Sequence, residues 1–344
     1  MRRSVPALAL LVLLLAVPLQ ASPRLQVVTT LPTYASIAGF VGGERVEVRS
    51  ISRPDEDSHF VKPKPSLALM LKSANLFVTT GLDLELWAPT LVDKSGNRAI
   101  RDGAIGYATA YQGVEMLDVP ASTSRAAGDV HIFGNPHIHT SPINAKIIAG
   151  NVARALIGVD PKGEETYRAN LEAFRRRIDV SLYGDELPDL IGADVLDRLA
   201  AQGKLIPFLE QKSYEGKPLL DRLGGWLRQG MVFRGKQVIA YHKNWIYFSS
   251  LFGLDVVDYV ERKPGIPPSA RHVHDLIGEI EKGGIHVLLS ATYFDPAKPQ
   301  AIADRTGCTV VRVPLEPDLD KGEDYFTLVN LWVGQLAAAF AAGS

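Results

Sequence analysis

The segment KQVIAYHKNWIYFSSLFGLDVVDYV, residues 236–260, carries the pattern from which the fold of this chain can be predicted. Two apolar runs, 236–241 and 255–260, flank a helical stretch that begins near Asn244. A strand, a helix and a second strand in this order indicate a βαβ unit, in which the two strands pair in parallel. The segment therefore predicts an α/β fold.

The same alternation continues towards the C-terminus. Further strands are predicted over IHVLLS (285–290) and TVVRV (309–313), and further helices begin near Ser269, Pro296 and Glu323. Four βα units within about a hundred residues predict a small doubly wound domain.

The N-terminal part repeats this rhythm. The apolar runs LQVVTT, RVEVRSI and ANLFVTT are predicted strands, and helical patterns accompany each of them. The strands lie at 25–30, 45–51 and 74–80, and the helices at 34–40, 67–72 and 83–92. We therefore expect a second α/β lobe with parallel strands.

A long helical pattern separates the two lobes. The stretch 161–184 begins with Pro161, has Glu164 and Glu165 in its first turn, and stops at Gly184. About twenty helical residues span about 30 Å, enough to cross a domain as a rigid connection. The following stretch, 185–232, fits neither lobe, and its apolar residues could pack against the long helix, cover the cleft or dock a partner.

We therefore expect five parts, and the chain length is compatible with two domains. They are a signal peptide (1–21), an N-terminal α/β lobe (22–158), a linking helix (159–184), a helical insertion (185–232) and a C-terminal α/β lobe (233–344).

The first residues have the pattern of a secretory signal. Arg2 and Arg3 precede an apolar run, and small residues follow at Ala21 and Ser22. The run is short for a membrane span, although an uncleaved anchor is the alternative. Cys308 is the one cysteine, expected in the core, so no intramolecular disulfide and no lipid attachment near the signal are expected. The pattern predicts a periplasmic protein without stable membrane insertion.

The charge balance bears on the partners. The chain has 37 basic and 38 acidic residues, a formal net charge of −1. Nucleic-acid binding would need a basic excess, so no nucleic-acid partner is expected.

Three of the eight histidines lie where a shared site is expected. His59 is in the loop after the strand 45–51, and His242 directly follows the strand 236–241. Ligands of open α/β sheets bind beyond the carboxyl ends of the strands. His137 lies in the loop GNPHIHTSPINA (134–145) that enters a helix. Three neutral imidazoles converging between the lobes suit Zn²⁺.

The other histidines are weaker candidates. His272 and His274 are two residues apart on a predicted helix and point to different faces, and His286 lies within a predicted strand. His131 and His139 stay undecided, with support of the site or exposure to solvent favoured over ligation.

Several stretches together resemble the metal-binding receptors of ABC importers for zinc and manganese. They are VVTTLPTYASIAGFVGGERVEV, SHFVKPKPSLALMLKSANLFVTTGLDLELW, NPHIHTSPINAKIIAGNVARAL, YHKNWIYFSSLFGL and FDPAKPQAIADRTGCTVVRV. The resemblance implies two parallel-sheet lobes joined by a long rigid helix, with a metal site in the cleft between them. It also implies a monomer that hands its metal ion to a membrane permease.

The resemblance implies three of the metal ligands. His59, His137 and His242 match its ligand positions, whereas His139 stands where the family usually has an aromatic residue. Ligation by imidazole also implies that metal affinity falls as the pH drops through the range in which imidazole is protonated.

The fourth ligand departs from the pattern. The family places a Glu or Asp where this chain has Ala291, in LLSATYFDP. Asp295, four residues further on, is the expected replacement. A water molecule or a carboxylate near His59 is the alternative, and the carboxylates there are Asp55, Glu56 and Asp57.

The donor set bears on the metal and on the function class. Manganese members resemble a site of two histidines and two carboxylates, so three histidines favour Zn²⁺ over Mn²⁺, although copper, nickel or cobalt would also bind. The histidine-rich loop of many zinc members is absent, since Gly103–Asp129 contains no histidine. Two alternatives are a zinc hydrolase or hydratase that uses an open three-histidine site, and a metal-dependent adhesin.

Overall fold

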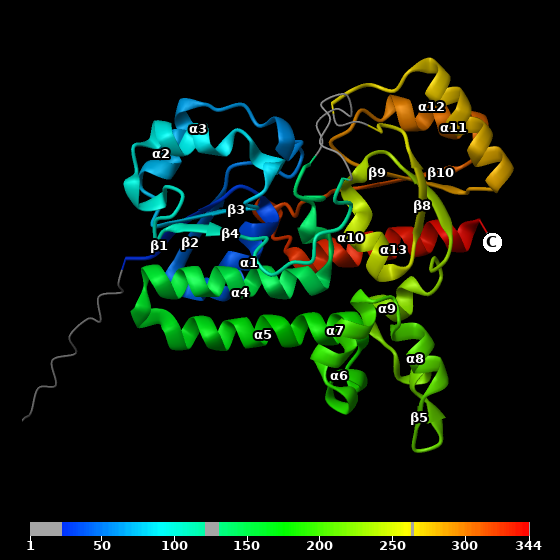
Figure 1. Ribbon diagram of the computed structural model, residues 1–344, viewed down its shortest axis with the longest axis horizontal. Coiled ribbons are helices and arrows are strands. Elements are labelled where there is room, and N and C mark those ends of the chain that lie inside the picture. Colours follow the sequence, from blue (N-terminus) through cyan, green and yellow to red (C-terminus); the bar gives the residue numbers. More distant parts are fainter. Residues whose placement is uncertain (1–22, 121–130, 263–264, 344) are drawn as a thin grey trace, which may run out of the picture.

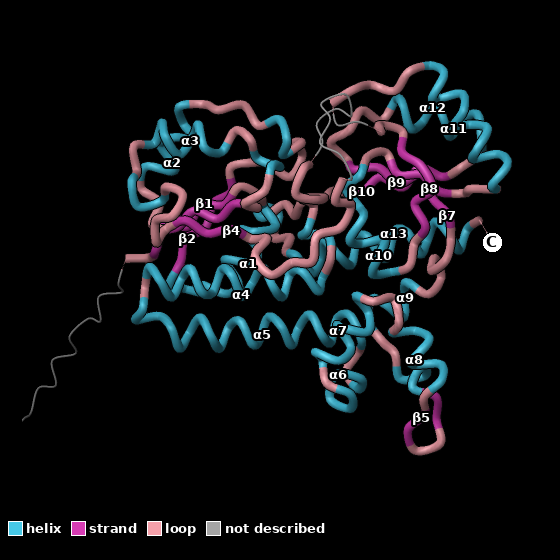
Figure 2. The backbone as a smooth tube through the Cα atoms, in the orientation of Figure 1, coloured by secondary structure: helices cyan, strands magenta, loops and turns pink. Residues whose placement is uncertain are grey.

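The computed structural model describes residues 23–120, 131–262 and 265–343. The expected signal peptide lies outside these residues. In the described part, two α/β lobes lie side by side, and a pair of long helices runs beneath the first lobe towards the second (Figure 1). Figure 2 shows each sheet enclosed by helices.

The first lobe contains a four-stranded parallel sheet of order β2-β1-β3-β4. Its strands are β1 (Leu25–Thr29), β2 (Val46–Ser50), β3 (Leu76–Thr79) and β4 (Tyr107–Thr109). Helices α1 (Pro32–Gly42) and α4 (Pro142–Val159) cover one face, and α2 (Pro65–Lys72) and α3 (Ala88–Ser95) cover the other.

Both faces of this sheet are buried, which explains the continuous apolar runs in the sequence. Val27 packs into the core shared with α1 and α4, whereas its neighbour Val28 packs into the core of α2 and α3. Leu76 and Phe77 alternate in the same way. Successive side chains of a strand point to opposite faces, so a parallel sheet between two helical layers needs apolar residues at both.

The second lobe has the same architecture, with a parallel sheet of order β10-β9-β7-β8. Its strands are β7 (Gln237–Ala240), β8 (Asp255–Tyr259), β9 (Val287–Ala291) and β10 (Thr309–Val313). Helices α11 (Ala270–Gly283) and α12 (Ala297–Thr306) cover one face, and α10 (Ile246–Phe252) and α13 (Tyr325–Ala342) cover the other. The predicted α/β fold with two parallel sheets is confirmed.

Helix α13 is, among the described residues, the one helix long and apolar enough to cross a membrane. In this fold it is a core helix of the second lobe, with Trp332 and Val333 fully buried. The indole N–H of Trp332 donates a hydrogen bond to the carbonyl of Pro314 at 2.6 Å. Its apolar composition is therefore explained by packing inside the protein.

The predicted linking helix is α5 (Glu164–Tyr183), which follows a short 3₁₀ turn at Pro161–Gly163. It runs alongside α4 and beneath the first lobe towards the second (Figure 1). Its twenty residues correspond to about 30 Å, as expected from the sequence.

The stretch after α5 lies at the end of that helix and extends beneath the second lobe, away from the sheets (Figure 1). It consists of α6 (Glu186–Ile191), α7 (Ala193–Ala201), α8 (Leu205–Gln211), a hairpin of β5 (Ser213–Tyr214) and β6 (Lys217–Pro218), and α9 (Gly225–Gly230). Leu205, Ile206, Leu219 and Trp226 are buried in the same core as α5. Of the three roles left open by the sequence, these side chains serve packing.

A buried ion cluster ties this stretch to the long helices. The Nζ atom of Lys146 on α4 lies 2.5 Å from Asp179 on α5 and also contacts Asp197 on α7. The hydroxyl of Tyr183 donates to Asp197 at 2.8 Å. Without the lysine, two carboxylates in a poorly solvated position would face each other.

Replacing Lys146 therefore tests how much this ion cluster contributes to the stability of the fold. We expect Lys146→Met to lower the free energy of unfolding by about 3 kcal/mol, because it leaves the buried carboxylates uncompensated. Urea unfolding measures the change. Arg168→Ala on α5 is the matched control, since its pair with Glu164 is exposed and contributes at most about 0.5 kcal/mol. Equal stability of the two variants would contradict the role of Lys146.

Candidate metal centre

The three histidines expected to share a site come together between the lobes. The ligand nitrogens that His59, His137 and His242 offer all lie within 4.8 Å of one another. The ring centroid of His59 lies 5.1 Å from that of His137 and 6.0 Å from that of His242, and the latter two rings are 6.3 Å apart. One cation can therefore reach all three imidazoles.

His59 is held by its own turn. It lies in a 3₁₀ turn, Ser58–Phe60, whose backbone is fixed when the indole of Trp87 donates to the carbonyl of Ser58 at 2.7 Å. The Oδ1 atom of Asp57 accepts the backbone N–H of His59 at 3.0 Å and lies 2.7 Å from its Nδ1. A carboxylate at Nδ1 leaves Nε2 as the free ligand atom.

His242 is held by the edge of the second sheet. His242 is the second residue after β7, and Glu261 is the second residue after β8, the neighbouring parallel strand. The backbone N–H of Glu261 donates to the carbonyl of Tyr241 at 2.7 Å, which brings its carboxylate to 3.5 Å from His242 Nδ1. A carboxylate again faces Nδ1.

His137 is the most buried member, with 1% of its surface exposed. Its backbone N–H donates to the side chain of Asn135, and the Asn135 amide donates to the carbonyl of Lys243 in the second lobe at 2.8 Å. Among the described residues, neither ring nitrogen of His137 has a hydrogen-bond partner. A buried polar atom without a partner is costly, and a bound cation would remove that cost.

Burial also favours the neutral form of His137 and His242. It lowers the pKa of His137 well below its ordinary value, and the neighbouring imidazoles lower it further. Burial, assisted by the charge of His59, lowers the pKa of His242 to about 3. A neutral imidazole offers its lone pair to a metal ion without first losing a proton.

Comparison with known proteins shows the family of this chain. Residues 27–181 and 211–339 match the model of the ZnuA family, described as the periplasmic component A of a zinc-uptake complex. The chain belongs to the ZnuA family. The unmatched residues, 182–210, contain α6, α7 and most of α8.

Relatives of this ZnuA-family chain have names that refer to different metals. It is 26% identical over 328 residues to the iron-binding protein YfeA of Yersinia pestis. The aligned region covers 94% of this chain and 88% of YfeA. It is 29% identical over 162 residues to the manganese ABC transporter substrate-binding lipoprotein PsaA of Streptococcus pneumoniae, which covers 46% of this chain and 49% of PsaA. The chain is thus aligned with about half of the manganese protein.

A solved structure shares the fold. The crystal structure of ZnuA superimposes with a TM-score of 0.66 at 20% identity, covering 92% of this chain and all of the other. The family and its relatives are periplasmic or extracellular metal-binding components of ABC transporters. This chain is such a component and not an enzyme, so the hydrolase alternative is wrong.

The sequence left His131 undecided, and in the structure of this ZnuA-family receptor it lies beside His59. Its Nε2 lies 3.3 Å from Nε2 of His59, and its Nδ1 lies 2.9 Å from Oδ1 of Asp83. Sequence reasoning named Asp57 only as an alternative metal ligand, and it missed Asp83 and Glu261 as partners of the histidines. For Glu261 a signal existed, because it follows its strand as His242 does.

His139, also undecided from the sequence, is fully buried behind His137. Its Nε2 lies 3.3 Å from Oε1 of Glu316, which follows β10 in the second lobe. Burial lowers the pKa of His139 to about 3 and raises the pKa of Glu316 to about 8. Glu316 also accepts the backbone N–H of Thr33 at the start of α1, so this contact joins the lobes.

Asp295, the expected fourth ligand, lies outside the three-histidine group. It is exposed, and its Oδ1 accepts the backbone N–H of Ala297 at the start of α12 at 2.9 Å. Ala291 is the last residue of β9 and is fully buried. Asp55 is paired with Arg53 at the surface. Ligation by Asp295 stays a prediction.

The low pKa values have a consequence for zinc binding. Between pH 7.5 and 5.5, three unperturbed imidazoles would cost about 1,000-fold in affinity, because protons displace the metal at each of them. Since His137 and His242 stay neutral over this range, we expect a loss well below 1,000-fold. Zinc titration against a chelator at both pH values measures it. A loss of the full size would mean that burial does not protect these ligands.

Proposed function

We propose that this receptor binds Zn²⁺ between its lobes through His59, His137 and His242 and delivers it to the permease of an ABC importer. The observation that carries the proposal is the meeting of these three imidazoles, His59 and His137 from the first lobe and His242 from the second. We further propose that it acts as a monomer in the periplasm after removal of its signal peptide.

The choice of zinc rests on donor chemistry. Zn²⁺ binds imidazole nitrogen readily in tetrahedral sites, whereas Mn²⁺ prefers carboxylate and carbonyl oxygen. The carboxylates of Asp57 and Glu261 face the Nδ1 atoms of their histidines. In this arrangement they orient the imidazoles and balance the charge of the ion.

Capture and release follow from the position of the ligands. A cation held by His59, His137 and His242 ties the two lobes, and its release needs them to separate slightly. The loop of His137 already binds the second lobe, because the hydroxyl of Tyr247 donates to the carbonyl of Asn135 at 2.8 Å. With α5 connecting the lobes, the expected motion is a small tilt.

Metal titrations of histidine variants test the site. We expect His59→Ala, His137→Ala and His242→Ala each to weaken Zn²⁺ binding by about 100-fold, because each removes a ligand that water replaces poorly. Isothermal titration with a competing chelator measures the dissociation constants. His274→Ala is the control, since His274 is exposed on α11. Mn²⁺ or Fe²⁺ binding more tightly than Zn²⁺ would contradict the choice of metal.

Delivery is tested with the membrane partner. We expect the zinc-loaded receptor to support ⁶⁵Zn uptake into vesicles that contain its cognate permease and ATPase, and His137→Ala to abolish uptake at a low zinc concentration. An adhesin would instead bind its surface partner without stimulating zinc uptake. Zinc binding combined with no stimulation of uptake would contradict a role in import.

A further inference from the structure

We propose that His131 is the fourth zinc ligand, so that the ion is held by four imidazoles. This inference rests on the proposed zinc site and adds a ligand to it. His131 precedes the loop of His137 in the first lobe and reaches the site from there. Its side chain is 12% exposed.

The distance between two ring nitrogens carries the proposal. In a tetrahedral zinc site with Zn–N distances of about 2.0–2.1 Å, two ligand nitrogens lie about 3.3–3.4 Å apart. The Nε2 atoms of His59 and His131 lie 3.3 Å apart. Their separation equals the edge of a zinc tetrahedron.

The carboxylate partners indicate which nitrogens carry protons. Asp57 faces Nδ1 of His59 at 2.7 Å, and Asp83 faces Nδ1 of His131 at 2.9 Å. In the neutral rings each Nδ1–H then donates to its carboxylate, and both Nε2 atoms carry lone pairs. Two lone pairs that face each other at this distance repel, and a cation between them turns this repulsion into attraction.

His131 is oriented as firmly as the expected ligands. The Oδ1 atom of Asp83 faces its ring, and Oδ2 accepts the backbone N–H of the next residue, Ile132, at 3.2 Å. Both oxygens of one carboxylate thus fix the ring and the backbone beside it. Carboxylates placed in this way hold metal-binding histidines and raise their basicity.

His131 is also close to the other ligands. It is not part of the group whose nitrogens all lie within 4.8 Å, but its ring centroid lies 6.4 Å from that of His137. His137 and His242, both in that group, have centroids 6.3 Å apart.

A fourth imidazole explains how the site tolerates Ala291. Four neutral ligands leave the charge of the ion at +2, which is costly to bury without compensation. The carboxylates of Asp57, Asp83 and Glu261 stand at the Nδ1 atoms of three of the four histidines. Negative charge thus lies directly behind the ligand imidazoles, so none of the ligands needs to be a carboxylate.

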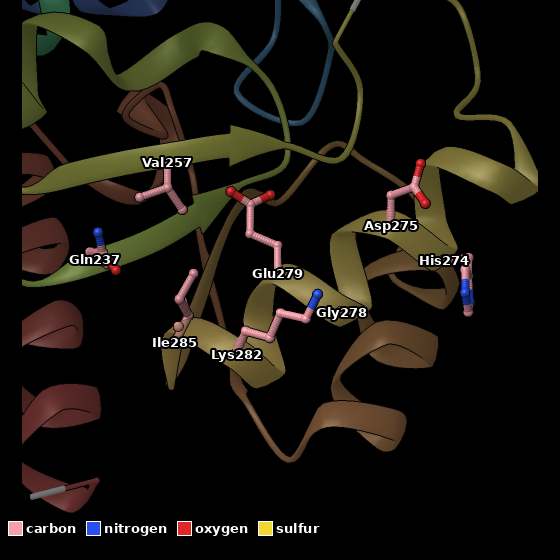
Figure 3. Close-up of a pocket in the computed structure, with 9 residues that line it drawn as sticks. Gln237, Val257, His274, Asp275, Gly278, Glu279, Lys282 and Ile285 are labelled. Carbon is pink, nitrogen blue, oxygen red and sulfur yellow. The ribbon is translucent and has the colours of Figure 1, made fainter.

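The test compares ligand substitutions by X-ray absorption at the zinc edge. The wild-type receptor is expected to show four imidazoles, and His131→Ala three imidazoles and one oxygen, with affinity reduced about 10- to 100-fold. His131→Cys is expected to add a Zn–S distance of about 2.3 Å. The control His274→Cys places a thiol on α11, beside the surface pocket in Figure 3. It is expected to show no Zn–S distance. Circular dichroism verifies that each variant is folded.

Two further variants separate the candidate donors. Asp83→Asn is expected to weaken binding less than His131→Ala, because it disturbs the ring without removing the ligand. Asp295→Asn is expected to leave affinity and spectrum unchanged. Loss of affinity in Asp295→Asn, with an unchanged spectrum in His131→Cys, would overturn the inference in favour of Asp295.

The inference and the proposed function fail differently. If His59→Ala and His242→Ala weaken zinc binding as expected while His131→Ala binds zinc as tightly as His274→Ala, only the role of His131 is overturned. If the wild-type receptor does not bind Zn²⁺, or if His59→Ala binds it unchanged, the zinc site itself is overturned.

Discussion

The proposed metal site depends on buried imidazole nitrogens that, within the described part of the protein, either lack a hydrogen-bond partner or face only another imidazole nitrogen. Both ring nitrogens of His137 lack a partner, and Nε2 of His59 faces Nε2 of His131 at 3.3 Å. A protein core does not tolerate such atoms without compensation. The arrangement is therefore stable with a cation in place and costly without one, and this difference in free energy is what a receptor uses to capture its ion.

The rest of the fold holds these nitrogens in position. His59 and His242 follow parallel strands of different sheets, and carboxylates near the same edges face their Nδ1 atoms. Parallel strands present their carboxyl ends at one edge, so two lobes that face each other bring two such edges together. The helices α4 and α5 and the buried Lys146 cluster make the connection between the lobes stiff.

A second contact between the lobes lies behind the site. His139 and Glu316 are buried together, and Glu316 also binds the first turn of α1. Burial disfavours the charged form of both groups. The neutral pair lets the lobes pack closely next to the site without adding charge beside it. The charge of a bound cation would instead be balanced by the carboxylates at the Nδ1 atoms.

The sequence by itself determined the two parallel sheets, the long helix and the placement of His59 and His242, because strand periodicity and the position of a residue after a strand are local properties. His137 was predicted from its loop and from the resemblance to a known family. The surroundings of these histidines were decided only by the tertiary structure. It buried His139, left Asp295 exposed in the turn before α12 and brought His131 to His59 across 72 positions of sequence. Contacts between loops depend on how segments far apart in the sequence pack against each other, and no local sequence pattern shows which of them will meet.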